Sequence, residues 1–180
     1  MVLNLIPIHL SGKRIILTEA LELGIGLLKN GNRIVQQAMY DHVISFDERF
    51  FEGLVRLFQH DSAEKKVSKR GSSSMRYSTV SSSMEDTVEG GVDDSISDLL
   101  EFLRLLCEDH FLPMQNYLRE QPDNAQSHNV IDQIVSYLQS IQWVIDPRSN
   151  APVWAIDSAA KVDLCRQILY TLIEFAQGCP

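Results

Sequence analysis

Four polar residues in this chain could together bind a cation. Glu108 and His110 stand close together in the middle of the chain, and Glu174 and Gln177 stand near its C-terminus. Carboxylate and carboxamide oxygens are ligands that hard cations such as calcium prefer, whereas an imidazole nitrogen is a poor calcium ligand. Glu108, Glu174 and Gln177 are therefore candidate calcium ligands. We expect His110 to support them, by orienting a carboxylate or holding a water.

Spacing along a helix decides which of these side chains can face one site. Glu174 and Gln177 are three residues apart, which places both on one helix face, about 5 to 6 Å apart at Cβ. Glu108 and His110 are two apart and would point to nearly opposite sides of a continuous helix. Both can face one site only if the helix unwinds around Asp109, and a nearby proline favours such unwinding.

The two glutamates also fall at the ends of their expected helices. Exposed carbonyls there carry partial negative charge and disfavour a carboxylate by ~0.3 to 1 kcal/mol, so a positive group is expected nearby. Calcium takes about 6 to 8 oxygen ligands, and this chain supplies only part of that set. The alternative is that each polar residue is simply solvated at a helix end, which is the more common arrangement when spacing alone is considered.

Composition limits the classes of function. The chain has 180 residues, of which 44% are hydrophobic and 22% charged, with a net charge of −8 and a pI near 5.0. An acidic chain lacks the clustered basic residues that bind nucleic acid, so no nucleic-acid partner is expected. Three cysteines without a Cys-x-x-Cys pair fit a reducing, cytosolic environment. No apolar run is long enough to span a membrane, and no catalytic motif is recognisable, so we expect no enzyme.

Apolar residues recur at intervals of three and four along most of the chain, which predicts an all-α fold of about seven helices. Short turns and no obvious closed bundle favour an armadillo-like α-solenoid segment. The expected helices cover approximately residues 16–28, 33–43, 48–58, 96–112, 114–120, 130–143 and 158–176.

A Ser-rich stretch over residues 61–94 interrupts this periodicity and is expected to be one long disordered loop. It divides the chain into N-terminal helices (1–60) and C-terminal helices (95–180) that carry the candidate calcium ligands. Ser72 and Ser73 follow basic residues in the loop and are candidate phosphorylation sites, although an unmodified flexible loop is the more common case.

The chain resembles the intracellular calcium-release channels, the inositol trisphosphate and ryanodine receptors, in the helical armadillo-like domain that precedes their transmembrane region. Four ordered motifs carry the resemblance: 23–32 (LGIGLLKNGN) with 35–37 (VQQ), 103–110 (LRLLCEDH), 115–119 (QNYLR) and 172–178 (LIEFAQG). Because these motifs are spread along the chain in the same order, the resemblance extends over most of the chain outside the Ser-rich loop.

The resemblance implies a calcium-sensing site at Glu108, Glu174 and Gln177, with His110 associated, completed by a residue from the far C-terminal region of the channel. It also implies a homotetrameric channel at the endoplasmic reticulum membrane, with this domain on the cytosolic face. The partners would be the C-terminal linker and the transmembrane region of the same channel. The motifs 35–37 and 115–119 look like those of ryanodine receptors, whereas the compact connection over 120–171 is closer to that of inositol trisphosphate receptors, which are slightly favoured.

Two departures from the family pattern stand beside the motifs. Phe111-Leu112-Pro113 replaces a more polar stretch, and Gly178-Cys179-Pro180 reverses the common order of Pro and Cys after Gly. Neither removes a candidate ligand. The alternative function is a helical adaptor that binds a protein partner without a cation.

Overall fold

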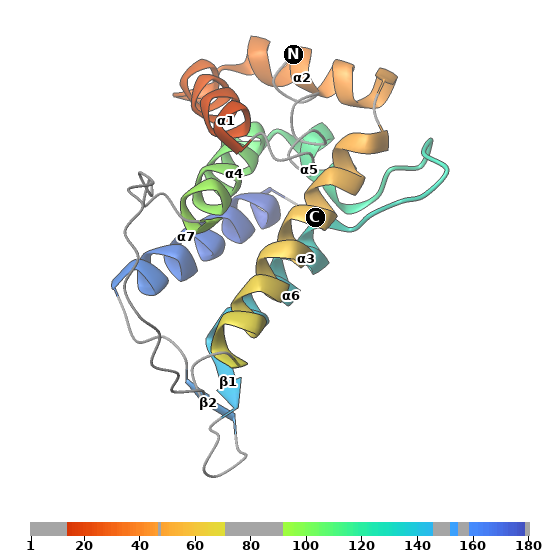
Figure 1. Cartoon of the computed structure of the whole chain (residues 1–180). Coiled ribbons are helices and arrows are strands. Elements are labelled where there is room, and N and C mark those ends of the chain that lie inside the picture. Colours follow the sequence, from red (N-terminus) through yellow and green to blue (C-terminus); the bar gives the residue numbers. More distant parts are fainter. Residues whose placement is uncertain (1–13, 47, 71–91, 146–151, 155–158, 179–180) are drawn as a thin grey trace.

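The computed structural model describes residues 14–46, 48–70, 92–145, 152–154 and 159–178. Within these ranges the chain forms seven α-helices and one pair of short strands, so the all-α class is confirmed (Figure 1). The elements are α1 (Arg14–Leu28), α2 (Arg33–Phe46), α3 (Glu48–Arg70), α4 (Val92–Cys107), α5 (Leu112–Arg119), α6 (Val130–Gln142), β1 (Trp143–Ile145), β2 (Pro152–Trp154) and α7 (Ala159–Ala176). None of the described helices is long and apolar enough to cross a membrane.

Helix α4 is the centre of the fold. It packs mainly against α1 and α7, and it also contacts α3 and α5 (Figure 1). Apolar residues lie almost all round it, as expected of a helix that is covered on several sides. Its buried residues are Ile96, Leu99, Leu100, Phe102, Leu103, Leu105, Leu106 and Cys107. Helices from both sides of the Ser-rich stretch thus share one hydrophobic core.

A second packing unit joins α3 to α6, which run side by side (Figure 1). The rings of Phe58 and Tyr137 lie 5.4 Å apart between their centroids. The buried Tyr137 hydroxyl donates a hydrogen bond of 2.6 Å to Asp61 Oδ2. This polar contact inside an apolar interface fixes the register of the two helices, because each group would be costly to bury without a partner.

Aromatic rings join α2, α3 and α5. Tyr40 of α2 meets Phe111 and Tyr117 edge to face, with centroids 5.9 and 5.8 Å apart, and Phe51 of α3 meets Tyr117 at 5.5 Å. Such pairs add about 0.5 to 1.5 kcal/mol each beyond the area that they bury. The cluster holds the start of α5 and the turn before it in a fixed position.

The helix boundaries on either side of the Ser-rich stretch, and the end of the helix that follows it, differ most from those expected from the sequence. Helix α3 continues to Arg70 and α4 begins at Val92, so residues 61–70 and 92–94 are helical and the expected loop is shorter. The extension of α3 is rich in Ala, Glu, Lys and Arg, which are good helix formers even without an apolar face. The remainder of that loop, 71–91, lies outside the described residues. Helix α4 ends at Cys107, earlier than expected.

The sequence predicted no strand, yet β1 and β2 pair antiparallel, with Trp143 opposite Trp154 and Ile145 opposite Pro152. Aromatic and β-branched residues favour strands, but three residues are too few to produce a periodic signal. The pair extends from the end of α6, away from α4 (Figure 1).

Candidate functional site

The backbone turns sharply directly after α4. Asp109 and His110 both adopt left-handed conformations, with φ of 58° and 57°. Two consecutive left-handed residues that are not glycine are costly, at about 1 to 2 kcal/mol each, and persist only when neighbouring groups fix them. The expected unwinding around Asp109 is therefore confirmed, and it releases Glu108 and His110 from the helical spacing that would have kept them apart.

Two side chains of α2 cap the end of α4. The Gln36 amide nitrogen donates hydrogen bonds to the carbonyls of Leu105 and Glu108, both at 2.9 Å. Arg33 Nη2 donates to the Asp109 carbonyl at 2.8 Å. Carbonyls at a helix end have no partner within the helix, so these donors stabilise the turn. Neither residue is recognisable as a cap from the sequence, because 69 to 76 positions separate them from these carbonyls.

The turn between α1 and α2 fixes the Glu108 side chain. The Gly31 N–H donates to Glu108 Oε2 at 2.9 Å. Gly31 has a φ of 63°, and a Cβ at this position would lie 2.2 Å from Asp109 Oδ2. Only glycine fits here, because both the conformation and the close approach exclude a side chain. In the sequence this glycine indicated only the end of a helix.

The end of α7 is tied to α5. The amide nitrogen of the buried Gln115 donates to the carbonyls of Glu174 and Gln177, at 2.8 and 3.0 Å. Arg119 Nη2 donates to the Phe175 carbonyl at 3.1 Å. The fold thus holds the last turn of α7 in place by its main chain. Gln115 and Arg119 belong to the QNYLR motif, whose spacing gave no sign of this capping role.

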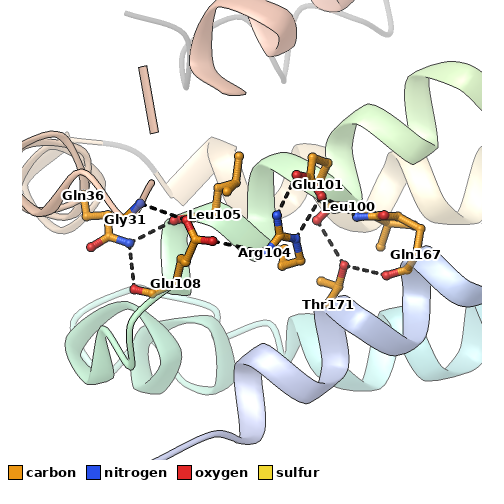
Figure 2. A network of polar contacts seen from close by, with 9 residues as sticks. All are labelled: Gly31, Gln36, Leu100, Glu101, Arg104, Leu105, Glu108, Gln167 and Thr171. Carbon is orange, nitrogen blue, oxygen red and sulfur yellow. Dashed lines mark hydrogen bonds and ion pairs between the residues drawn. The ribbon is translucent and has the colours of Figure 1, made fainter. Parts of the chain in front are cut away.

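A polar seam runs between α4 and α7. It consists of Glu101 and Arg104 of α4, of Glu108 directly after α4, and of Gln167, Thr171 and Glu174 of α7, and will be called the α4–α7 seam. Thr171 Oγ1 donates to the Leu100 carbonyl at 3.1 Å or to the Gln167 carbonyl at 2.9 Å, as Figure 2 shows. Gln167 Nε2 donates to Glu101 Oε2 at 2.8 Å, so side chains of both helices bridge the interface.

Arg104 is the central charge of this seam. Its Nε and Nη2 donate to the two carboxylate oxygens of Glu101 at 2.9 and 2.7 Å. Its Nη1 lies 3.5 Å from Glu108 Oε1 (Figure 2). The Arg104 hydrogen bond lowers the pKa of Glu101. The positive group expected near Glu108 is therefore supplied by the chain itself.

Glu174 lies within the electrostatic range of Glu108. Burial of the carboxyl group raises the pKa of Glu174, and Arg104 lowers it. The Glu108 and Asp109 carboxylates raise the same pKa, whereas His110 lowers it. The ends of α4 and α7 lie near each other, because a Cβ on Gly178 would meet His110, and burial favours the protonated form of Glu174.

The remaining predicted residues have different positions. Gln177 is exposed, and its carbonyl is held by Gln115. His110 is exposed and lies against Gly178. Among the residues that the structure describes, no three His, Cys, Asp or Glu side chains gather closely enough to hold a metal ion. Ser72 and Ser73 lie outside the described residues.

Comparison with known proteins identifies the class of this segment. Residues 92–180, which contain α4 to α7 and the whole seam, match the family described as RyR and IP3R Homology associated. This part of the chain is thus similar to a family that is named after the ryanodine and inositol trisphosphate receptors.

A curated relative supports the same conclusion. The inositol 1,4,5-trisphosphate receptor itr-1 of Caenorhabditis elegans is 32% identical over 83 residues, which make up 46% of this chain and 3% of the relative. The resemblance to inositol trisphosphate and ryanodine receptors is therefore confirmed, and the chain matches only a small part of the relative's length.

Proposed function

We propose that this chain is a cytosolic regulatory domain of an intracellular ligand-gated calcium-release channel, and that it contributes to calcium sensing and gating. The family match and the similarity to itr-1 support this assignment, and itr-1 slightly favours the inositol trisphosphate receptor. In this proposal the domain is an armadillo-like segment on the cytosolic face of the endoplasmic reticulum membrane. It acts within a homotetramer, against the C-terminal linker and the transmembrane region of the same channel.

The proposed sensor binds regulatory calcium between the ends of α4 and α7. Glu108 and Glu174 supply carboxylate oxygens, Gln177 supplies a further oxygen, and His110 assists without direct ligation. The carrying observation is that Glu174 is partly buried and feels the charge of Glu108 although 66 positions separate them in sequence. A carboxylate such as Glu174, whose ionisation is disfavoured by burial and by a neighbouring carboxylate, is stabilised by a divalent cation.

Ligands outside this chain complete the site in this proposal, because calcium needs about 6 to 8 oxygens. Calcium would then bind more tightly when the C-terminal linker is docked at the seam than when it is not. By thermodynamic linkage, calcium then favours the docked state. The equilibrium between docked and undocked linker shifts by at most the ratio of the calcium affinities of these two states, and docking favours the open channel. This explains how an ion at a helix junction changes a distant pore.

The test is calcium activation of the full-length channel that carries this chain, recorded over a range of cytosolic calcium. Glu174→Gln and Glu108→Gln retain side-chain shape but remove a charged ligand, and should raise the activating calcium concentration at least about tenfold. Glu52→Gln is the matched control, since it removes a carboxylate from the exposed face of α3. Unchanged activation in both seam variants would rule out the sensor.

An adaptor without a cation remains a second candidate, because α7 exposes an apolar stripe. Its residues Val162, Leu169, Tyr170 and Ile173 are 43 to 54% exposed. Exposed apolar stripes of this kind mark interaction surfaces. If the chain is an adaptor, the double variant Leu169→Ser/Ile173→Ser should alter channel gating at every calcium concentration. The Glu174 and Glu108 variants should then behave as wild type.

A further inference from the structure

We propose that the outward face of α7 in one copy of this chain binds the outward face of α1 in a second copy. Both faces combine exposed apolar residues with one charged residue. The α7 face consists of Val162, Arg166, Leu169, Tyr170 and Ile173, and the α1 face consists of Ile16, Glu19, Leu23, Gly26 and Leu27. The inference goes beyond the proposed function, because it assigns a partner to two surfaces and involves no cation.

Helix α7 is apolar on two opposite sides. Its inward side buries Leu164, Ile168 and Phe175 in the core, yet Leu169 and Ile173 on its outward side are 51 and 52% exposed. A helix that is apolar all round is one that is covered all round. Exposed apolar stripes mark interaction surfaces, so the α7 face is a docking surface.

Helix α1 has a second exposed stripe, and its charge is opposite. Leu23 and Leu27 are 59 and 45% exposed, and the exposed Glu19 lies beside them, whereas the α7 face carries Arg166. Helices α1 and α7 both pack on α4, which lies between them (Figure 1). Both stripes are exposed in the single chain, so they do not cover each other there. A second copy can bring the acidic face against the basic one.

The two stripes also have the same spacing. Each has three apolar residues at intervals of seven and four, which are Ile16, Leu23 and Leu27 on α1, and Val162, Leu169 and Ile173 on α7. Residues at these intervals lie on one side of a helix. Two helices that lie parallel therefore bring all three apolar pairs into contact in a single register.

This register places opposite charges together. When Ile16 lies opposite Val162, Glu19 comes within one residue of Arg166. At about 100° per residue, Glu19 lies to one side of the α1 stripe and Arg166 to the other side of the α7 stripe, and these sides meet in a parallel pair. Arg166 pairs with Asp163 in the single chain. Such an exposed pair contributes little, so the guanidinium can turn to Glu19.

Gly26 and Tyr170 fit each other along the same edge. Gly26 is exposed inside α1, and a Cβ at this position would meet nothing within 4 Å. Glycine weakens a helix interior, and no contact within the described residues requires it here. In the parallel register Tyr170, which is 54% exposed, lies two residues from the position opposite Gly26. The missing side chain leaves room for the tyrosine ring.

The oligomeric state of the chain tests this contact. The two faces differ, so each bound copy leaves one α1 face and one α7 face open, and association continues past the dimer. A single helix pair is smaller than a standard interface and should bind weakly. In sedimentation velocity the mass should therefore rise beyond that of a dimer between about 10 μM and 1 mM. A chain that stays monomeric, or that stops at a dimer, would overturn the inference.

Two blocked variants test which faces meet. Leu23→Lys with Leu27→Lys blocks the α1 face, and Leu169→Lys with Ile173→Lys blocks the α7 face, all at exposed positions that the fold does not need. Each variant alone should raise the dissociation constant at least about thirtyfold, because central apolar contacts are lost. A mixture of the two should form a dimer with wild-type affinity, because each variant keeps the face that the other needs. A mixture that remains monomeric would refute the pairing of α7 with α1.

A charge exchange tests the register. Glu19→Arg and Arg166→Glu should each weaken association about threefold, the effect of one exposed ion pair, and the double variant should recover wild-type affinity. General loss of structure would not produce such a recovery. The control exchanges Glu52 and Arg56, an exposed pair on α3, and should leave association unchanged. Additive weakening in the double variant would show that Glu19 does not face Arg166, and the parallel contact would be wrong.

Discussion

Gly178 lies directly against His110, so that the end of α7 touches the turn that ends α4. A Cβ on Gly178 would stand 3.2 Å from the Cβ and 3.3 Å from the Cγ of His110, and the φ of Gly178 is 71°. The contact joins residues 68 positions apart in the sequence. It permits the two helix ends that carry Glu108 and Glu174 to meet.

Replacing this glycine should weaken the junction. Gly178→Ala combines a left-handed backbone with a tight contact and should lower the free energy of unfolding by about 1 to 2 kcal/mol, measured by urea denaturation of the expressed chain. Gly26→Ala is the control, because its added Cβ meets nothing within 4 Å and the residue lies inside α1. That control should raise stability by up to about 1 kcal/mol. Equal effects of both variants would contradict the role of the close contact.

Gly31 should tolerate substitution even less. Gly31→Ala brings a methyl group to 2.2 Å from Asp109 Oδ2 at a φ of 63°, and should cost about 2 to 3 kcal/mol of unfolding free energy. Asp109→Gly removes that carboxylate and suits the left-handed backbone at this position. A double-mutant cycle should therefore recover about half of the loss. Additive effects would show that the two residues do not press on each other.

Gln115 should be essential for the end of α7. Gln115→Leu keeps the volume but leaves the carbonyls of Glu174 and Gln177 without their donor, which should cost about 2 to 3 kcal/mol. Hydrogen exchange should become faster in the last turn of α7 before it changes in α4. Asn116→Leu, at an exposed position of the same helix, should alter neither quantity appreciably. Uniform acceleration across all helices would indicate a general loss of packing instead.

The pH dependence of stability should differ between two glutamates of the seam. Burial raises the pKa of Glu174 in the folded chain above its value in the unfolded chain. The free energy of unfolding therefore falls as pH rises from the ordinary pKa of glutamate to this raised pKa, because ionisation then favours the unfolded chain. Arg104 lowers the pKa of Glu101, so Glu101 contributes stability at neutral pH that is lost as pH falls through the lowered pKa.

Glutamine variants measure these contributions directly. Without calcium, Glu174→Gln should stabilise the chain at pH 7 relative to wild type, and the gain should shrink in acid. Glu101→Gln should destabilise it at pH 7, and that loss should shrink in acid. Urea midpoints at several pH values decide the matter, and a Glu174→Gln variant that is less stable than wild type at pH 7 would contradict the assigned environment.

Much of the fold was predictable because it depends on local periodicity. The intervals of three and four among apolar residues identified all seven described helices. Glu108 and His110 are two residues apart and can face one site only if the helix unwinds around Asp109, where the structure has a turn. The extent of α3 was missed because its last turns have helix propensity without an apolar face. The strand pair was missed because three residues carry no measurable period.

The candidate site was predictable only in part, because its supports are distant in sequence. Glu108 and Glu174 could be selected by residue type and helix position. Gly31, Gln36 and Arg104 could not, since a glycine in a turn, an amide in a helix and an arginine in an apolar run have many ordinary roles. Their partners become known only when α1, α2 and α7 are placed against α4.

The position of Glu108 depends on residues of α2 and of the turn before it. Gln36 donates to the carbonyl of Glu108 and Gly31 donates to its carboxylate, yet both residues precede the segment 92–180 that matches the family model. A fragment cut to that segment would keep every candidate ligand but lose both restraints on Glu108. The left-handed turn at Asp109 and His110 would then be free to relax into another turn of helix. The Glu108 side chain would rotate away from Glu174.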